Sequence, residues 1–599
     1  MAYTTIAEMF LQTTETHPNK PLLYQKKEHE WRSLTGMDIR NAVSDIAYGM
    51  LGLNLGPKSP VVILGRNSPQ WVLADYACAC TGFPSVGVYT TLVQTQLRGI
   101  LNNAWPGLVF LDSYSDFERQ EDLWTDLHQI QHFVVFENDA PPDHPRVQNL
   151  KTFRKRGAEE RKRQSQPLKH LAQKINPEDP LTIIYMQNPA GDLQGIVLSH
   201  DNVVSNLKDI QMRLPFFAED VFLSYLPLNH AFERTVGHYA PFANGASIYY
   251  IEDLNRMARN IWEVQPTVMV GVPRFYEKLN AMVLDQVRHY KGLTYKLFWW
   301  GVDCGTEYFS HFLSGEEVSR LLRFKYTLAR KFVFPKIKAL VGGKVRMMIC
   351  GGAALAPDIT EFFNCTGLPI LEGYGLTETS PVLTCNTISE MRIGTVGKAL
   401  PSVELRLKPD GEILARGPNI MLGYYKDEKA TAEVMDDQGW LHTGDLGEFD
   451  NDGYLTITGR KKDIIITSAG KNISPLPLET ALNQSRFIDQ VMVVGDRRKF
   501  ISALIVPDFP ALIKHLQELD VSCTDPEALV DLALVNEIIQ SEIDLVNARF
   551  SHYEQVRGFI LLSGGIVTEG RQLTLSLQVS RSQIEAQYRE QLDRLYTGG

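Results

Sequence analysis

The chain has 599 residues, 44% of them hydrophobic and 22% charged, with a formal net charge of −10 at pH 7. This length exceeds what one hydrophobic core usually serves, so we expect a globular protein of two or more domains. The negative charge argues against a nucleic-acid binder, and neither a secretory signal nor a transmembrane segment is expected from the apolar runs.

The seven cysteines are scattered and include no CxxC pair. Neither a zinc site nor a disulfide framework is therefore expected. This pattern indicates a reduced, cytoplasmic protein.

Helix-like and strand-like segments alternate in the first part of the chain. Apolar periodicity predicts helices at residues 38–53 and 70–80, and short apolar runs predict buried strands at residues 60–64, 86–89 and 109–111. Strands that alternate with helices predict α/β layers, with a mainly parallel sheet covered by helices on both faces.

Residues 151–174 carry the densest charge, including the runs RKRG and RKRQ. A solvated surface helix or loop is the simpler interpretation. A basic patch for an anionic membrane surface is the alternative, which the acidic Glu159 and Glu160 within the run weaken.

Residues 185–200 read YMQNPAGDLQGIVLSH and lie between two apolar, strand-like runs. A loop of small residues between two strands can wrap backbone N–H groups around phosphate, although an ordinary hairpin has the same pattern. The stretch resembles the phosphate loop of the adenylate-forming superfamily, which includes acyl-CoA synthetases and reads roughly YTSGTTGxPKGVxLTH. The matching positions are Tyr185, Gly191, Gly195, Leu198 and His200.

The sequence in the middle of this loop differs from the family motif. Its Ser/Thr/Gly run is replaced by Met186, Gln187, Asn188, Pro189 and Ala190, and its lysine by Gln194. Pro189 has no N–H and fixes φ, so it removes a donor and stiffens the loop. Gln194 can still donate a hydrogen bond but carries no charge. The changes predict a weakened hold on a triphosphate.

Two further segments, SYLPLNHAFER at residues 224–234 and EVQPTVMVGVPRFYEKL at 263–279, resemble long-chain acyl-CoA synthetases. The resemblance implies an acyl pocket in the form of a deep apolar tunnel. Its border would be formed by His230, Phe232, Val270 and Pro273. For His230, a core histidine is an equally good interpretation. An aromatic cluster at residues 295–313 is more typical of core packing than of a ligand wall.

The motif LEGYGLTETSP at residues 371–381 is the most specific in the chain, and a strand entering a Gly-Gly turn precedes it at residues 345–354. The resemblance implies that Tyr374 stacks on adenine, the Thr377 hydroxyl binds phosphate and Glu378 holds Mg²⁺. These residue types suit the tasks, because a flat ring suits a base and a carboxylate suits a hard cation.

The motifs WLHTGD (residues 440–445) and GYLTITGRKKD (453–463) also match. The resemblance implies that Asp445 and Arg460 contact ribose, and that Lys462 is the hinge between an AMP-binding domain (1–460) and a mobile cap domain (461–599). The implied CoA channel residues are Ser468, Ala469 and Gly470. The implied nucleotide-binding residues are Gly191, Gly195, Gly352, Ala353, Tyr374, Gly375, Thr377, Asp445 and Arg460.

The last departure lies near the C-terminus. Long-chain synthetases read LTPTLKVKRK there, and the first lysine bridges the carboxylate and the α-phosphate. This chain reads LTLSLQVSRS at residues 573–582, so that lysine is Gln578. A helix is expected downstream at residues 583–596.

The resemblance covers essentially the whole chain and implies an ATP-dependent long-chain fatty acid–CoA ligase. Its partners would be fatty acid, ATP or AMP, Mg²⁺ and CoA, with peripheral membrane contact as an option. The catalytic candidates are Thr377, Glu378, Gln194 and Gln578. Because both glutamines replace lysines, two alternatives stay open: a pseudoenzyme that binds AMP, acyl-adenylate or acyl chains, and an enzyme that performs only the thioester half-reaction.

Overall fold

The computed structural model describes residues 3–137, 139, 144–164, 166–187, 193–251, 256–468, 470–566 and 581–597. The chain forms two compact units. Unit 1 comprises Met1–Ala353, Pro357–Leu405 and Ala415–Leu441, and unit 2 comprises Ala354–Ala356, Arg406–Leu414 and His442–Gly599. The main boundary between the units therefore falls before His442, and the division at residues 460 and 461 stays a prediction.

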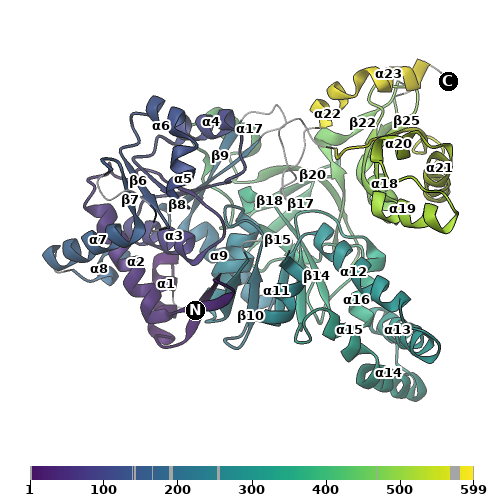
Figure 1. The fold of residues 1–599 in the computed structure, drawn as a ribbon, viewed down its shortest axis with the longest axis horizontal. Coiled ribbons are helices and arrows are strands. Elements are labelled where there is room, and N and C mark those ends of the chain that lie inside the picture. The colour runs from purple at the N-terminus through teal and green to yellow at the C-terminus, as the bar shows by residue number, and fades with distance from the viewer. Residues whose placement is uncertain are drawn as a thin grey trace. The chain divides into compact units, whose positions relative to one another are not determined.

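Unit 1 contains an eight-stranded sheet in the order β19-β9-β8-β4-β3-β5-β6-β7. Neighbouring strands pair in parallel from β8 to β7, while β9 pairs antiparallel with β8 and with β19. Helices cover both faces of this sheet (Figure 1). The strands are β3 (Val61–Leu64), β4 (Ser85–Val88), β5 (Leu108–Leu111), β6 (His132–Val135), β7 (Val147–Asn149), β8 (Pro180–Gln187), β9 (Leu193–Ser199) and β19 (Gly423–Tyr424).

A nine-stranded sheet, also in unit 1, has the order β16-β15-β14-β13-β12-β10-β11-β1-β2. The strands from β14 to β1 pair in parallel, and both ends of the sheet are antiparallel. The strands are β1 (Pro21–Lys27), β2 (Glu30–Thr35), β10 (Val221–Ser224), β11 (Ser247–Tyr250), β12 (Val268–Gly271), β13 (Met347–Cys350), β14 (Ile370–Gly375), β15 (Val382–Cys385) and β16 (Lys398–Ala399). The predicted α/β class with mainly parallel sheets is confirmed.

Several helices of unit 1, among them α1, α2, α3 and α9, begin where a polar side chain accepts a hydrogen bond from a free backbone N–H. After β9, α9 (His200–Arg213) starts at once, because the Ser199 hydroxyl accepts from the Asn202 N–H (3.0 Å) and the Asn202 side chain accepts from the Ser199 N–H (2.8 Å). The main helices are α1 (Ile6–Thr16), α2 (Gly36–Leu51), α3 (Pro69–Thr81), α4 (Gln94–Ala104), α7 (Leu150–Gln164), α11 (Met257–Val264), α12 (Pro273–Arg288), α13 (Leu293–Ser314), α14 (Arg320–Phe332), α15 (Phe334–Leu340), α16 (Pro357–Cys365) and α17 (Glu428–Val434).

The C-terminal part of the chain has smaller sheets. Strands β17 (Glu404–Leu407), β18 (Glu412–Arg416), β20 (Leu441–Phe449) and β21 (Leu455–Arg460) form one, β22 (Ile465–Ile466) and β23 (Asn472–Ile473) a second, and β24 (Ile488–Val494), β25 (Ile501–Pro507) and β26 (Val556–Leu561) a third. The helices are α18 (Pro475–Leu482), α19 (Phe509–Glu518), α20 (Pro526–Asp531), α21 (Ala533–Asn547), α22 (Arg581–Gln587) and α23 (Arg589–Thr597).

The helix expected at residues 583–596 is divided in two. A turn at Tyr588 separates α22 from α23. Each half still buries an apolar residue, Ile584 and Leu592, in the same small cluster beside β24 and β25. Both short helices are therefore fixed by the apolar residue that each buries.

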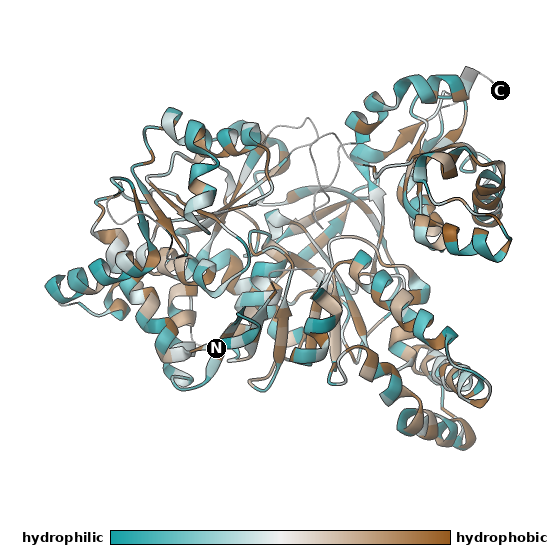
Figure 2. Ribbon diagram, viewed as in Figure 1, coloured by the Kyte–Doolittle hydropathy of each residue, from teal (hydrophilic) through white to brown (hydrophobic). Residues whose placement is uncertain are grey.

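The strands are mostly hydrophobic, and the helices carry both hydrophobic and hydrophilic residues (Figure 2). In the described part of the chain no helix is long and apolar enough to cross a membrane.

A buried arginine joins the two large sheets. Arg234 lies in a π-helix (Glu233–Tyr239) that follows β10 of the nine-stranded sheet. Its guanidinium donates to the Thr182 hydroxyl on β8 (2.8 Å) and to the Ser85 hydroxyl on β4 (2.6 Å) of the eight-stranded sheet. The same group forms an ion pair with Asp75 of α3, and both side chains are almost fully buried. The charge is thus paired and hydrogen-bonded, as a buried charge must be.

Arg234→Ala should destabilise unit 1 by about 3–5 kcal/mol, because the Asp75 carboxylate would stay buried without a partner. The measurement is the thermal unfolding midpoint. Arg98→Ala is the matched control, since Arg98 forms an exposed ion pair with Asp126 (2.7 Å) that is worth at most about 1 kcal/mol. Equal shifts in the two variants would contradict a structural role for the buried pair.

Candidate functional site

Four adjacent parallel strands end at one edge of the nine-stranded sheet. β10 ends at Ser224, β12 at Gly271, β13 at Cys350 and β14 at Gly375. The segments predicted to bind acyl chain and nucleotide follow these ends directly. Ligands of open α/β sheets bind in the crevice outside the carboxyl ends of the strands, so this edge is the candidate site.

The Gly-Gly turn after β13 lies against the predicted acyl segment. The Gly351 N–H donates to the Gly271 carbonyl (3.2 Å). A side chain at Gly351 would lie only 3.0 Å from the Phe232 ring, and Gly352 has a φ of +89°, which favours glycine. The turn thus brings Phe232 next to Gly351, the residue before Gly352, and the ligand-binding roles of Phe232 and Gly352 stay predictions.

The LEGYGLTETSP motif forms the end of β14 and a tight turn. A Cβ at Gly375 would lie 1.7 Å from the Pro381 carbonyl oxygen, so no other residue fits there. The Leu376 N–H donates to the Thr379 hydroxyl (2.9 Å), which closes the 3₁₀ turn Thr377–Thr379. Tyr374 and Thr377 are half-buried at the edge of the sheet.

Glu378 is connected to the strand that carries Gln194. The Tyr424 hydroxyl donates to Glu378 Oε1 (3.3 Å), and the Met421 N–H donates to the Glu378 carbonyl (2.8 Å). Tyr424 pairs with Ile196 of β9, two residues beyond Gln194. Burial, with the Glu378 charge beside it, raises the pKa of the Tyr424 hydroxyl, which therefore stays protonated and able to donate.

Tyr424 is a residue that the sequence motifs miss. Its only signal is an aromatic pair after a glycine, in the run Gly423-Tyr424-Tyr425. That signal has neither a helical nor a strand period. It does not indicate the contact with Glu378, 46 residues earlier in the chain, which depends on the fold.

The strands that flank the predicted phosphate loop form an antiparallel pair. β8 and β9 pair in the register that sets Met186 opposite Gln194 and Gln187 opposite Leu193. Gln194 is half-buried, while Gly195 is buried where a Cβ would lie 2.9 Å from Ile183. The Tyr185 hydroxyl donates to Asn103 (2.5 Å). The loop positions Asn188, Pro189, Ala190 and Gly191 lie outside the described residues.

The acyl-pocket candidates lie after β10 and around the end of β12. His230 is half-buried with its ring edge-on to Tyr89, at 5.0 Å between ring centroids. Burial of the imidazole lowers the pKa of His230 to about 4, so the ring is neutral at pH 7. Val270 and Pro273 are buried. A tunnel between these segments stays a prediction.

Within unit 2, Asp445 and Arg460 face each other in the β20–β21 hairpin. Arg460 Nε donates to Asp445 Oδ1 (2.8 Å), and the Asp445 side chain is buried. The pairing holds the Asp445 carboxylate in place, and an ionised carboxylate only accepts hydrogen bonds, as two ribose hydroxyls require.

The hinge candidate and the described CoA-channel candidates are exposed. Lys462 lies in the 3₁₀ turn Lys461–Asp463 directly after β21, and neighbouring Lys461 pairs with Asp410 (2.7 Å). Ser468 and Gly470 lie at the tip of the β22–β23 hairpin, where Gly470 has a φ of +73°. Ala469 and Gln578 lie outside the described residues.

Residues 10–425 match the AMP-binding enzyme family, and residues 462–599 match the AMP-binding enzyme C-terminal domain. The chain belongs to the AMP-binding enzyme family.

Similar proteins include the long-chain-fatty-acid–CoA ligase FadD15 of Mycobacterium tuberculosis, 29% identical over 99% of this chain and 97% of that protein. The peroxisomal long chain acyl-CoA synthetase 6 of Arabidopsis thaliana is 28% identical over 95% of this chain and 82% of its own. Among solved structures, the anthranilate CoA ligase AuaEII in complex with anthranoyl-AMP has a TM-score of 0.73 at 18% identity, covering 98% of each chain. This structural similarity confirms the predicted adenylate-forming fold.

Gly375→Ala should weaken AMP binding by roughly tenfold, equivalent to ~1.4 kcal/mol, because the added methyl group must displace the Pro381 carbonyl and with it the turn that carries Thr377. Calorimetry with AMP measures the effect. Gly56→Ala is the matched control, since a Cβ there meets nothing within 4 Å. An unchanged affinity in a folded Gly375→Ala variant would place the nucleotide elsewhere.

Proposed function

We propose that this protein is an ATP-dependent long-chain fatty acid–CoA ligase with a weakened hold on the triphosphate. The observation that carries the proposal is the Tyr374–Glu378 motif at the carboxyl edge of the sheet, in a chain similar over 99% of its length to a ligase of that name. The edge position matters because the reaction needs nucleotide and carboxylate to meet in one crevice.

The proposed reaction has two displacements. A carboxylate oxygen of the fatty acid attacks the α-phosphorus of ATP, and the bond to pyrophosphate breaks to give an acyl-adenylate. The CoA sulfur, after losing its proton, then attacks the acyl carbonyl carbon, and AMP leaves. Both steps build negative charge on oxygen, which fixed donors and cations stabilise.

In this proposal each nucleotide-binding candidate has a separate role. Tyr374 stacks on adenine, while the Thr377 hydroxyl and backbone groups at Gly195, Gly352 and Ala353 serve the phosphates. Asp445 and Arg460 bind the ribose.

Glu378 fits a Mg²⁺ site of the usual nucleotide type. Mg²⁺ is commonly held by one or two carboxylates together with substrate phosphates and water, so a large protein cage is not required. Among the described residues, no three His, Cys, Asp or Glu side chains group as ligands. Glu378 is half-buried at the sheet edge and supplies the single carboxylate. Bound there, the ion would neutralise charge on the phosphates.

The acyl chain is assigned to the segments after β10 and β12. His230, neutral at pH 7, would border the chain together with Phe232, Val270 and Pro273, as an apolar pocket with few polar groups requires. The thioester step would follow a rotation of the cap about Lys462 that brings Ser468, Ala469 and Gly470 to the CoA channel.

The pseudoenzyme alternative rests on Gln194 and Gln578. Loss of one preorganised stabiliser of transition-state charge typically costs about 10²–10³ in rate. The half-reaction alternative needs only the second displacement. Both are outcomes of the experiments below.

We also propose a reducing compartment such as the cytoplasm, with peripheral contact to membranes. All seven cysteines are free, and six of them are buried. A long-chain substrate partitions into bilayers, so contact with a membrane surface would shorten its path to the site.

AMP should bind more tightly than ATP. The residues assigned to adenosine are of the family's types, whereas the loop from Met186 to Gln194 lacks the hydroxyl groups and the lysine that the family has there. Calorimetry on the wild type with each nucleotide and Mg²⁺ measures the order. Tyr374→Ala serves as the control and should weaken both nucleotides alike, because both carry adenine. ATP binding at least as tight as AMP binding would contradict a weakened hold on the triphosphate.

Adenylation should be slow and restorable. Gln578→Lys alone should help less than Gln194→Lys with Gln578→Lys, because a bridging lysine acts only on a triphosphate already held in line. The largest gain, about tenfold or more, is expected when the hydroxyl- and glycine-rich loop is also restored at residues 186–190. The measurement is fatty-acid-dependent pyrophosphate release, with Gln173→Lys as the charge control at an exposed position.

Two results of that assay would change the account. Wild-type release as fast as that of FadD15, measured beside it, would show that other groups supply the missing charge. A fully restored variant that stays inactive while it folds and binds AMP would move the defect elsewhere, to cap rotation about Lys462 first.

A further inference from the structure

Exposed apolar side chains concentrate on the hairpin formed by α13 and α14. The two helices lie side by side, with Tyr308 of α13 stacked on Tyr326 of α14 at 3.9 Å between centroids. Of the expected aromatic cluster, Phe298 is buried and Trp299 and Trp300 are half-buried, so core packing explains part of it. The exposed large apolar side chains on the two helices are Leu293, Tyr295, Leu297, Phe312, Leu313, Leu321, Phe324 and Phe332.

α14 has two apolar faces. Leu322 and Ala329 are buried and, with Tyr326, lie on the side of α13. Leu321, Phe324 and Phe332 are 65%, 62% and 53% exposed. With half-buried Leu328 they are spaced by three, four and four residues, which places them in one stripe along the helix. This second stripe faces away from the core.

Basic residues flank the stripe. α14 carries five of them, Arg320, Arg323, Lys325, Arg330 and Lys331, and no acidic residue. At about 100° per residue, Lys325 falls on one side of the stripe, and Arg320 and Lys331 fall on the other. Positive charge is thus concentrated beside exposed apolar groups in a chain whose net charge is −10.

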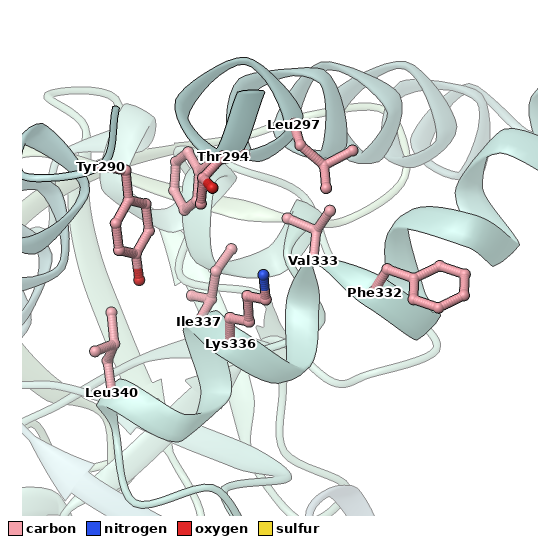
Figure 3. Close-up of a pocket in the computed structure, with 9 residues that line it drawn as sticks. Tyr290, Thr294, Leu297, Phe332, Val333, Lys336, Ile337 and Leu340 are labelled. Carbon is pink, nitrogen blue, oxygen red and sulfur yellow. The ribbon is translucent and has the colours of Figure 1, made fainter. Parts of the chain in front are cut away.

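A shallow apolar hollow continues the stripe toward the start of α13. It contains about 310 Å³ of empty space, open to solvent. Figure 3 shows Leu297 of α13 pointing toward Val333, with the Lys336 ammonium beside them. The other lining residues are Tyr290, Thr294, Phe298, Phe332, Ile337 and Leu340. Phe332 belongs to both hollow and stripe, so the apolar surface is continuous.

We propose that the α13–α14 hairpin is a docking surface for an anionic phospholipid bilayer. The stripe of Leu321, Phe324, Leu328 and Phe332 would enter the boundary between headgroups and acyl chains, and the flanking lysines and arginines would contact headgroup phosphates. An amphipathic helix with Phe and Leu on one face and Lys and Arg beside it binds membranes in this way. Each such cation near an anionic surface adds to the affinity.

Charge complementarity favours lipid over a second copy of this chain. A symmetric dimer through the stripe would bring the basic residues of two copies together and repel. An anionic bilayer pairs with all of them, and these basic residues would offset locally the repulsion that a chain of net charge −10 meets at an anionic surface.

The basic helix α7, which the sequence offered as a membrane patch, is less suited. Its Arg154 and Arg161 both lie 3.4 Å from Asp45, and Arg163 pairs with Glu160 at 2.8 Å. Its apolar residues Leu150 and Phe153 are buried. No large apolar side chain on the described α7 is exposed.

This inference goes beyond the ligase reaction, since membrane binding needs neither ATP nor CoA. The test is co-sedimentation of the full chain with vesicles of phosphatidylcholine alone or mixed with phosphatidylglycerol. Wild type should bind the mixed vesicles and not the neutral ones, and binding should fall with added salt. Absence of binding to mixed vesicles would overturn the proposal.

Two variants locate the surface. Leu321→Ser/Phe324→Ser/Phe332→Ser and, separately, Arg320→Glu/Lys331→Glu should each lose roughly tenfold or more in affinity. The matched controls are Met212→Ser/Trp262→Ser/Leu545→Ser, three apolar residues exposed elsewhere, and Lys155→Glu/Arg156→Glu on α7. Both controls should bind as wild type does. Full binding by either hairpin variant would overturn the proposal.

A measurement on wild type covers the case of a hairpin variant that does not fold. Hydrogen exchange should slow on α13 and α14 when mixed vesicles are added, and not on α7. Protection on α7 alone would contradict the proposal. So would a lipid-free dimer that the triple serine variant converts to monomer, because a second copy would then cover the stripe.

Discussion

The Arg234 guanidinium is the contact on which the candidate site depends. It follows β10 of one sheet and donates to β4 and β8 of the other, with the Asp75 carboxylate balancing its charge. β8 continues into the hairpin that carries Gln194, and β10 continues into the segment that carries His230 and Phe232. A single buried, fully paired cation thus fixes the spacing of two sheets that each contribute to the site.

The candidate site lies at the carboxyl ends of strands from these two sheets. The nine-stranded sheet supplies Gly352, Tyr374 and Thr377 at one edge, and the eight-stranded sheet supplies Gln194 through β9. Tyr424 joins the two parts, since it pairs with β9 by its backbone and with Glu378 by its hydroxyl. Neutral donors such as Gln194 and Tyr424 occupy this region, so we propose that the charge on a triphosphate is the feature most affected.

Much of this arrangement could be predicted from local pattern. Short apolar runs marked the buried strands β3, β4 and β5, and Gly375 lies in a motif whose turn admits no side chain. The Tyr424–Glu378 contact could not be predicted, because it joins residues far apart in the chain. The two apolar faces of α14 are visible as periodicity, but which of them is covered depends on where α13 packs. The division of the last helix at Tyr588 has no proline or glycine to mark it.

The most direct test of the account is hydrogen exchange of the wild type with and without a non-hydrolysable long-chain acyl-adenylate analogue. Such a ligand spans both halves of the proposed crevice. The account predicts slowed exchange in the turns after β13 and β14, at residues 351–353 and 374–379, together with the segment at 228–233. Protection that avoids these turns while the analogue is bound would contradict a site at the carboxyl edge of the nine-stranded sheet.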